Sequence, residues 1–463
     1  MTRLDLIASY TKGSKVVCDI GCDHAYALIN SIKKYGVEKG IAADINEGPL
    51  NNAIKSIKSN NLENNIKAIL SNGFDSILDD FDTAIISGMG GKLICEILTK
   101  GLDKIKGKKL ILEANSDMED VRRFLINNGF KIVNEEALYD QNKYYEILVA
   151  EDGISSYDEF DILYGPLLRV YKNEAFIKHY NEQIKLLEEV LPKINDKNIQ
   201  RAKMYKLFEI KHILVGSHPN KYYLKDNINF YRTYFIDDNP RPTIVVAPGG
   251  GYLYTSPRES EPVVNEFNKR GYHVVVINYR ETLNAYPEPG NNLKEAIDSI
   301  KNDKRISKLI GLGFSAGGHA ILELILHKND YKLEANFDLL MLGYPVITSN
   351  PKHAHMGSFK HVLLENENNQ ELRDYLSLEK QVNFENVIDL FLWGTYTEES
   401  VPVHNSLLLL DAYKKANGNA EYHMFPMGGH GLSVCNEMST DKPIKYISRW
   451  VDMAHEWINN KLG

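Results

Sequence analysis

The sequence predicts two α/β domains that are joined by a helical segment. The chain has 463 residues, which is more than one hydrophobic core usually supports, and about 150 residues per domain gives two to four domains. Apolar, strand-like runs alternate with amphipathic stretches up to about residue 150, and the alternation restarts near residue 225. With 43% hydrophobic and 25% charged residues, the composition is that of a folded globular protein, which excludes a disordered or fibrous chain.

Seven strands are expected in the first α/β domain, over residues 1–155. A short turn around Asp140 separates the last two, so they should pair as an antiparallel hairpin at the sheet edge. The sheet should therefore be doubly wound, with the last strand reversed. The expected strands cover residues 15–20, 40–44, 67–70, 83–87, 109–113, 131–138 and 145–150.

Residues 156–215 are expected to form a helical arm, followed by a linker over residues 216–224. Pro192 should end a first helix, and a second helix over residues 199–213 should return along it. Residues 167–213 contain ten Lys or Arg and six Asp or Glu, a net charge of +4. Apolar residues at alternating spacings of four and three indicate a coiled-coil seam, namely Tyr180, Ile184, Leu187, Leu191 and Ile194.

A second α/β domain is expected over residues 225–463, because strand-like runs are again connected by stretches of helical length. Six strands are expected there, over residues 243–247, 272–278, 309–313, 339–344, 390–393 and 420–425.

The chain as a whole is acidic, with 54 Lys and Arg against 62 Asp and Glu and a formal net charge of −8. This balance argues against binding of nucleic acid over the whole surface, whereas the basic arm is either a solvated helical face or a local nucleic-acid contact. No apolar run reaches the roughly 18 residues of a membrane helix, and the N-terminus lacks a signal-peptide pattern, so we expect a cytoplasmic protein without a membrane partner. The four cysteines are too widely spaced for a disulfide framework, which predicts reduced thiols and no metal site.

The ends of the first three strands carry residues suited to a nucleotide-like cofactor. Gly21 follows the first strand, but the second and third glycines of a dinucleotide fingerprint are missing, which argues against NAD. Asp19 suits a cationic sulfonium ligand better than a pyrophosphate. Asp44 can accept hydrogen bonds from ribose hydroxyls, and Asn72 can bind an adenine edge. Ordinary turn residues are the alternative interpretation of each.

Four segments of the first half form a recognisable set: Asp19-Ile-Gly-Cys-Asp-His-Ala-Tyr26, Asn46-Glu-Gly-Pro49, Ile86-Ser-Gly-Met-Gly-Gly91 and Tyr144-Tyr-Glu-Ile-Leu-Val-Ala-Glu151. Through these segments the first 215 residues resemble the bacterial tRNA (adenine-22-N1)-methyltransferases. The resemblance implies a class I S-adenosylmethionine-dependent methyltransferase fold with a coiled-coil arm, S-adenosyl-L-methionine as cofactor and tRNA as partner. Asn72 stands where that family leads us to expect Asp, and Glu113-Ala-Asn115 where we expect Gln-Pro-Asn.

This reaction needs an adenine that is flipped out of its pairing, so that N1 lines up behind the methyl group. Asp23 would stabilise the cationic product or accept the N6 proton, and Gly88 would contact the cofactor where the backbone carries no side chain. His24 either contacts substrate or packs at the helix end. The residues expected to contact tRNA are His24, Tyr26, Met89 and Gly90 at the pocket and, on the arm, Lys178, Lys185, Lys193, Lys197, Arg201, Lys203 and Lys206.

Gly313-Phe-Ser-Ala-Gly317 in the second domain has the G-x-S-x-G pattern of a nucleophile elbow, between a strand and an apolar helix. Ser315 would be the nucleophile and His430, in Gly428-Gly-His-Gly431, the base. The chain order of nucleophile, acid and histidine is that of α/β-hydrolases. Backbone N–H groups of the oxyanion hole are expected from Gly250 or Gly251 and from Ala316.

Five segments of the second half form another recognisable set: Pro248-Gly-Gly-Gly-Tyr252, Arg258-Glu259, Gly343-Tyr-Pro-Val346, Ser400-Val-Pro-Val403 and Phe425-Pro-Met-Gly-Gly-His430. Through these segments residues 225–445 resemble acetylesterase-type α/β-hydrolases, which implies small carboxylic esters as substrates. In that family an Asp stands three residues before a Val-Pro pair, and here Glu398 takes that place, with Glu399 and Asp411 as poorer candidates for the acid.

The sequence thus predicts a bifunctional fusion of two enzymes. Two alternatives stay open: an esterase with a non-catalytic RNA-binding module, and a methyltransferase with an inactive hydrolase appendage.

Overall fold

The computed structural model describes residues 2–155, 157–214, 222–225, 228–280 and 285–463. Its contacts divide the chain into two compact units, Met1–Gln183 and Ile184–Gly463, and each is described by itself. In the part of the chain that is described, no helix combines the length and apolar character needed to cross a membrane.

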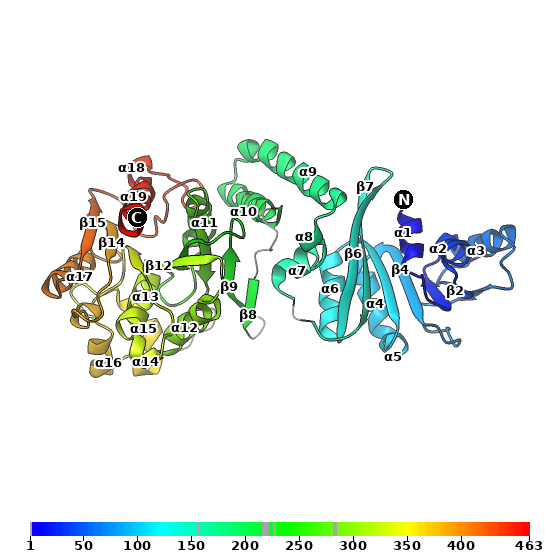
Figure 1. The fold of residues 1–463 in the computed structure, drawn as a ribbon, viewed down its shortest axis with the longest axis horizontal. Coiled ribbons are helices and arrows are strands. Elements are labelled where there is room, and N and C mark those ends of the chain that lie inside the picture. Colours follow the sequence, from blue (N-terminus) through cyan, green and yellow to red (C-terminus); the bar gives the residue numbers. More distant parts are fainter. Residues whose placement is uncertain (1, 156, 215–221, 226–227, 281–284) are drawn as a thin grey trace. The chain divides into compact units, whose positions relative to one another are not determined.

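The first unit is built on a seven-stranded sheet with the order β3-β2-β1-β4-β5-β7-β6 (Figure 1). All seven predicted strands are present, and β6 and β7 form the predicted antiparallel hairpin, with only β7 running against the others. The strands are β1 (Val16–Ile20), β2 (Lys39–Asp44), β3 (Ile66–Leu70), β4 (Thr83–Gly90), β5 (Lys109–Ser116), β6 (Phe130–Asp140) and β7 (Lys143–Asp152). The strand order reverses between β1 and β4, so a crevice is expected at their carboxyl ends.

Helices cover both faces of this sheet because alternate strand residues point to opposite sides. Val17 and Ile85 pack in a core with α1, α2 and α3, whereas Cys18 and Ile86 pack in a second core with α4, α5 and α6. The helices are α1 (Arg3–Ser9), α2 (Tyr26–Tyr35), α3 (Glu47–Ser59), α4 (Gly91–Lys100), α5 (Leu102–Ile105) and α6 (Met118–Asn127). This confirms the doubly wound α/β fold predicted for the first domain.

The predicted helical arm consists of several helices. The turn predicted at Pro192 is present, since a 3₁₀ turn, η1 (Leu191–Lys193), separates the two long helices. The seam is partly formed, with Tyr180 and Leu187 buried and its other residues half-buried. The helices are α7 (Glu159–Tyr164), α8 (Leu168–Tyr171), α9 (Glu174–Val190) and α10 (Lys197–Leu214).

α10 is part of the second unit, and its apolar face packs into a core of that unit. Phe208 is buried in this core together with Val263 of α11 (Glu261–Asn268) and Trp450 of α19 (Trp450–Leu462), and Met204 and Tyr205 pack against it. The expectation that the second helix packs along the first is therefore incomplete. The physical reason is that α10 presents apolar side chains one turn apart, Met204 and Phe208, and these pack in the core of the second unit.

The second unit contains an eight-stranded sheet with the order β15-β14-β13-β12-β10-β11-β9-β8 (Figure 1). The six predicted strands are present as β10 to β15, and β8 and β9 were missed. Residues 222–225 form β8, so the expectation of a linker up to residue 224 is wrong there, while residues 216–221 of that linker lie outside the described residues. The strands are β8 (Tyr222–Lys225), β9 (Ile228–Tyr234), β10 (Arg241–Ala247), β11 (His273–Ile277), β12 (Ile306–Phe314), β13 (Leu339–Gly343), β14 (Leu390–Thr395) and β15 (Ala420–Phe425).

The helices of this unit lie on both faces of its sheet. One core includes residues of α12, α13 and α17, and the other includes residues of α10, α11 and α19. The helices are α11 (Glu261–Asn268), α12 (Glu288–Ile300), α13 (Ala316–Leu326), α14 (Lys328–Tyr331), α15 (Met356–Leu363), α16 (Gln370–Tyr375), α17 (His404–Lys415), α18 (Lys445–Ser448) and α19 (Trp450–Leu462). Three further 3₁₀ turns are η2 (Pro257–Glu259), η3 (Leu364–Asn366) and η4 (Leu378–Lys380).

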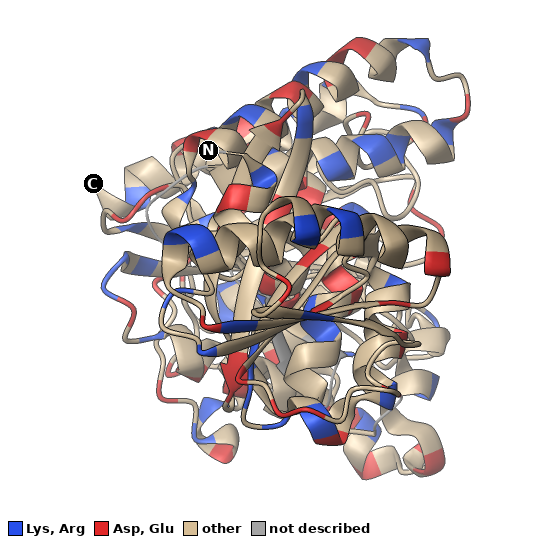
Figure 2. Ribbon diagram, turned by 90° about the vertical axis from the view of Figure 1, so that its right-hand side faces the viewer, with Lys and Arg blue, Asp and Glu red and all other residues tan. Residues whose placement is uncertain are grey.

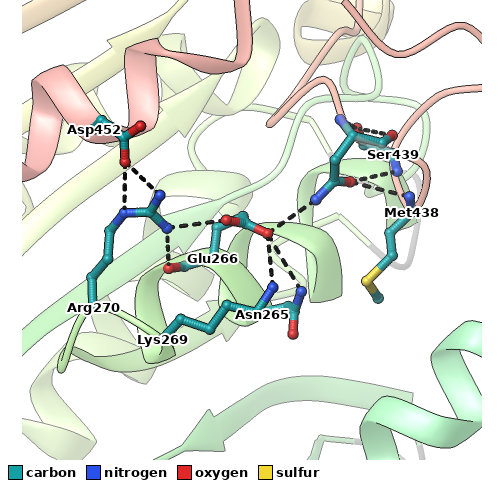
Figure 3. A network of polar contacts seen from close by, with 8 residues as sticks. Asn265, Glu266, Lys269, Arg270, Met438, Ser439 and Asp452 are labelled. Carbon is teal, nitrogen blue, oxygen red and sulfur yellow. Dashed lines mark hydrogen bonds and ion pairs between the residues drawn. The ribbon is translucent and has the colours of Figure 1, made fainter. Parts of the chain in front are cut away.

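A polar network ties the C-terminal segment to α11 (Figure 3). Glu266 forms ion pairs with Lys269 and Arg270, and Arg270 also donates to Asp452 of α19. Glu266 further accepts a hydrogen bond from the side-chain amide of Asn436, at 3.2 Å. The loop that follows His430 in the sequence is therefore anchored through Asn436 to α11.

Candidate active sites

Ser315 stands at a sharp turn between β12 and α13. Its backbone has φ 51° and ψ −121°, a strained conformation for a residue with a side chain. A Cβ on Gly313 would lie 2.6 Å from the Cα of Gly318, and one on Gly317 would lie 2.1 Å from the carbonyl oxygen of Ala247. The two flanking glycines are thus required by close packing, which is the reason for the G-x-S-x-G pattern.

The structure brings Ser315, His430 and Glu398 together from three separate segments. The Oγ of Ser315 lies 2.9 Å from Nε2 of His430, and Nδ1 of the same ring lies 3.0 Å from Oε2 of Glu398. Glu398 follows β14, and His430 follows β15. The arrangement has the geometry of a nucleophile, a general base and an orienting acid.

Glu398 is held as a carboxylate by its hydrogen bonds. Its Oε1 accepts from the backbone N–H groups of Ser400 and Val401, at 2.7 and 3.1 Å. Burial alone raises the pKa of Glu398, but the hydrogen bond to His430 and the two backbone N–H groups outweigh it, so the pKa lies below its usual value. Nδ1 of His430 therefore donates to Glu398, which leaves Nε2 free to accept the Ser315 proton.

The two other candidate acids lie elsewhere. Glu399 is exposed to solvent, and Asp411 is an exposed residue of α17 that pairs with Lys415. Neither is hydrogen-bonded to His430 in the described part of the chain. Glu398 is thus the carboxylate that the geometry supports as the acid.

The loop after β10 offers backbone N–H groups beside Ser315. A Cβ on Gly249 would lie 2.9 Å from the Cβ of Ser315, so this loop passes close to the nucleophile. The N–H of Gly249 donates to Glu259, which leaves the N–H groups of Gly250 and Gly251 as the candidates for the oxyanion hole. Gly250 and Gly251 have φ 132° and 61°, and the Cβ of any residue at Gly250 would lie 2.1 Å from the carbonyl oxygen of Tyr254. Ala316 begins α13, where the first N–H groups of a helix have no partner within it.

The sequence assigned no role to Glu259 and Tyr344. In the structure these two residues contact the glycine loop and His430. Glu259 is buried and accepts from the Tyr344 hydroxyl at 2.6 Å and from the Gly249 N–H at 2.7 Å. Burial raises the pKa of Glu259. The Tyr344 ring packs edge-on against the ring of His430, with centroids 5.1 Å apart. Both residues occur in the quoted motifs, but only the fold brings them together.

The pocket in front of Ser315 has a volume of about 550 Å³, a size suited to a small ester. Its wall is formed by the glycine loop, by η2 and by residues near α15. The lining residues are Gly250, Gly251, Leu253, Tyr254, Ser256, Pro257, Arg258, Glu259, Ser315, His355, His361, Ser400, His430 and Gly431.

In the first unit, two carboxylates are buried at the carboxyl ends of neighbouring strands. Asp19 lies in β1 and Asp44 ends β2, and both are almost fully buried. Burial, together with the charge of Asp44, raises the pKa of Asp19 to about 7. Among the described residues, neither carboxylate has a basic side chain within ion-pair distance. A cationic ligand would relieve this repulsion, so the pair fits a sulfonium compound such as the one expected from the sequence.

The glycine turn between these carboxylates leaves no room for a side chain. Gly21 has φ 76°, and a Cβ there would lie 2.0 Å from Cε of Met89. Gly88 has φ 79° and donates its N–H to Glu113 at 2.8 Å, and Glu113 also pairs with Arg3. Strand β4 runs on through Gly90, three residues beyond the predicted end, so these residues lie on the strand itself.

Of the predicted site residues after β1, Asp23 and Tyr26 are exposed and His24 is half-buried. Asp23 and Ala25 have φ 40° and 54°, unusual values that occur at functional sites. The His24 ring stacks on Tyr26 with centroids 5.2 Å apart, and His24 Nε2 lies 3.9 Å from Asp23. Asn72 is exposed two residues after β3, at the same edge of the sheet.

The basic residues of the arm have different surroundings. Lys185 and Lys193 are exposed, whereas Arg201 is mostly buried and forms an ion pair with Asp441. The packing of α10 thus brings Arg201 to an acidic partner, and its contact with tRNA stays a prediction. Figure 2 shows that Lys and Arg alternate with Asp and Glu along the helices. Among the described residues, no group of three or more His, Cys, Asp or Glu side chains is arranged to hold a metal ion.

Comparison with known proteins identifies a family for each half. Residues 17–214 match the family model described as tRNA (adenine(22)-N(1))-methyltransferase, and residues 235–448 match the family model BD-FAE. The tRNA (adenine(22)-N(1))-methyltransferase of Bacillus subtilis is 31% identical over 216 residues, which cover 45% of this chain and 91% of the relative.

Two further relatives are similar to one half each. The endo-1,4-beta-xylanase B of Butyrivibrio fibrisolvens is 34% identical over 218 residues, which cover 43% of this chain, and the chain spans only about a third (34%) of that relative's length. A solved structure of the Streptococcus pneumoniae protein Sp1610 in complex with S-adenosyl-L-methionine is 32% identical, with 46% of this chain and 100% of that chain covered and a TM-score of 0.43. Through residues 17–214 the chain belongs to the tRNA (adenine(22)-N(1))-methyltransferase family, and residues 235–448 match the BD-FAE family model.

Proposed function

We propose that the first half transfers a methyl group from S-adenosyl-L-methionine to N1 of adenine 22 in tRNA. The observation that carries this proposal is the buried pair of Asp19 and Asp44, which lacks a basic partner among the described residues and lies at the carboxyl ends of the neighbouring strands β1 and β2. S-adenosyl-L-methionine, when bound, supplies an electrophilic methyl group on a cationic sulfur. The family to which residues 17–214 belong supports the same reaction.

In this reaction the chain orients two reactants rather than activating a nucleophile. Asp44 would accept the ribose hydroxyls, and Asp19 would balance the positive charge of the cofactor. Gly88 and Gly90 would let the flat base approach the backbone of β4. The exposed carboxylate of Asp23 would stabilise the cationic methylated base or accept its N6 proton.

The transfer is tested with the full-length chain, labelled S-adenosyl-L-methionine and unmodified tRNA. We expect N1-methyladenosine at position 22 in the nucleoside mass spectrum and at least a tenfold lower rate for Asp23→Asn, about the contribution of one charged contact. Lys33→Gln, an exposed change on α2, is the control. Tight calorimetric binding of the cofactor without any methylated adenine would instead favour the non-catalytic RNA-binding module.

Cofactor binding should depend on pH through Asp19. Its pKa of about 7 means that the side chain is neutral at pH 6 and a carboxylate at pH 8. Because the cationic ligand binds the carboxylate better, its affinity should fall about tenfold from pH 8 to pH 6. Calorimetry across this range measures the effect, and Asp19→Asn should bind weakly at both pH values. A slope as steep in Asp19→Asn as in the native chain would contradict the assignment, since the ligand's own amino group would then explain it.

We further propose that the second half hydrolyses small carboxylic esters, acetyl esters among them. The carrying observation is the hydrogen-bonded series Ser315–His430–Glu398 at the floor of an open pocket. Ser315 Oγ would attack the ester carbonyl as His430 takes its proton, and the N–H groups of Ala316 and Gly250 or Gly251 would bind the oxyanion. The alcohol leaves with the proton from His430, and water then releases the acid from Ser315. Release of 4-nitrophenolate from 4-nitrophenyl acetate by the full-length chain tests this half.

The two activities suggest a division of the chain. We propose residues 1–155 as the methyltransferase domain, residues 156–215 as the tRNA-binding arm and residues 222–463, which include β8, as the hydrolase domain. Lys185 and Lys193 would contact the tRNA backbone from the arm without reading its sequence. α10 belongs to this arm by sequence and to the second unit by packing.

A further inference from the structure

The wall of the hydrolase pocket carries an arginine that the ester chemistry leaves unused. Arg258 lies in η2, is exposed and lines the pocket in front of Ser315. Among the described residues, its guanidinium has no carboxylate, carbonyl or aromatic partner. Arg201 and Arg232, in contrast, form ion pairs with Asp441 and Glu261. A single exposed arginine does not make a binding site, but other groups of the same pocket wall also favour an anionic ligand.

Two histidines line the pocket with defined hydrogen bonds. Nδ1 of His355 accepts from the backbone N–H of Ser358 at 3.2 Å, so the neutral ring carries its proton on Nε2. Burial lowers the pKa of His355, and the neighbouring His430 lowers it further, which keeps this ring neutral. His361 donates from Nδ1 to the carbonyl of Gly251 at 2.8 Å. His355 therefore offers an N–H donor, and His361 fixes the glycine loop.

The pocket lining offers no free acid to oppose these donors. Glu259 is the one carboxylate among the lining residues, and its two oxygens accept from Tyr344 and from the Gly249 N–H. Glu398 lies outside the lining and is bonded to His430. The described wall thus presents one positive charge and an N–H donor to whatever enters, and its own carboxylate is already satisfied.

We propose that the pocket selects esters that carry an anionic group, a carboxylate or a phosphate, held by Arg258 and by Nε2–H of His355. This inference rests on the proposed hydrolase function and names its substrate class. A guanidinium binds either oxyanion through paired N–H groups. Leu253 and Tyr254 line the pocket as well, each more than half exposed, and would contact the apolar part of such an ester. Arg258 breaks no bond, so its role is to determine specificity.

Three acetyl esters with different alcohol parts test the proposal: 3-acetoxypropyl phosphate, 4-acetoxybutanoate and the neutral 3-acetoxypropanol. The kcat/KM for acetate release from at least one anionic ester should exceed that of the neutral ester about tenfold or more. Comparison of the phosphate ester with the carboxylate ester shows which anion is preferred. Arg258→Gln should lower this ratio about tenfold, mainly through KM, and Arg258→Lys should restore part of it. Arg449→Gln, an exposed arginine outside the pocket lining, is the matched control.

Binding is also measured without turnover, so that the two proposals fail separately. Ser315→Ala is titrated with the same three esters by calorimetry, with and without Arg258→Gln. If Ser315→Ala binds an anionic ester more tightly than the neutral one, and Arg258→Gln abolishes this preference, the inference is supported. If the native chain nevertheless hydrolyses none of the three esters, only the proposed hydrolase function is overturned. Equal binding and equal kcat/KM for charged and neutral esters, unchanged by Arg258→Gln, overturns the inference alone.

Discussion

Replacing Ser315 by alanine should lower kcat for 4-nitrophenyl acetate by about 10⁴-fold to 10⁶-fold, because the remaining backbone donors cannot form an acyl-enzyme. The change removes one oxygen from the Ser315–His430 hydrogen bond of 2.9 Å and leaves the turn conformation in place. His430→Ala should cost about as much, since the two residues act as a unit. Initial rates of 4-nitrophenolate release, corrected for spontaneous hydrolysis, measure the loss.

The role of Glu398 as the acid that orients His430 is tested by the same release of 4-nitrophenolate. Glu398→Gln keeps the length of the side chain but presents no full negative charge to His430, and kcat should fall about 10³-fold to 10⁴-fold. Glu399→Gln changes the adjacent, exposed residue and should leave the rate within about twofold, because a surface change is usually neutral. Retention of most of the rate by Glu398→Gln would show that another group orients His430. A fluorophosphonate probe that labels the native chain but not Ser315→Ala would exclude an inactive appendage.

Arg122→Ala should destabilise the methyltransferase domain by about 3–5 kcal/mol, because it leaves buried carboxylates without their partner. Arg122 is 1% exposed, pairs with Glu135 at 2.8 Å and Glu146 at 2.5 Å, and donates to the carbonyl of Ile162. It thereby joins α6 to the β6–β7 hairpin and to α7. The adjacent Arg123 forms an exposed pair with Glu159, so Arg123→Ala should cost only about 0–1 kcal/mol.

Hydrogen exchange separates this effect from the stability of the second unit. The opening free energy of amides in β6 and β7 should fall in Arg122→Ala, whereas amides of β12 and β13 serve as an internal reference. The same measurement on Arg123→Ala provides the matched control. Equal losses for the two variants would mean that the buried ion pairs contribute no more than a surface pair.

Hydrophobic alternation predicts the sheets well because a doubly wound sheet buries its strands on both faces. Residues such as Val17 and Ile244 lie in continuous apolar runs that are followed by helices, and these signals are local. β8 and β9 were missed because they pair with each other at the sheet edge without a helix between them. No βαβ alternation marks such a hairpin.

The candidate site residues could be predicted where each one lies in a short sequence motif with a known role. Ser315, His430 and Glu398 each occur in a short pattern, and the structure brings all three into hydrogen-bonding distance. Glu259 and Tyr344 could not be assigned in this way, because their roles arise from a buried contact between segments 85 residues apart. Likewise, the charge count identified the basic arm but not Asp441, the acidic partner of Arg201 within the same unit.

The packing of α10 determines where the gene can be divided. A cut after residue 215, at the end of the sequence-defined arm, would remove Phe208 from its core with Tyr234 and α11 and leave both fragments with an uncovered apolar surface. A cut in the turn between η1 and α10 keeps this helix with the hydrolase. α10 is thus part of the sequence-defined arm but folds with the second unit, and a fragment made for independent expression of that unit should begin at about residue 195.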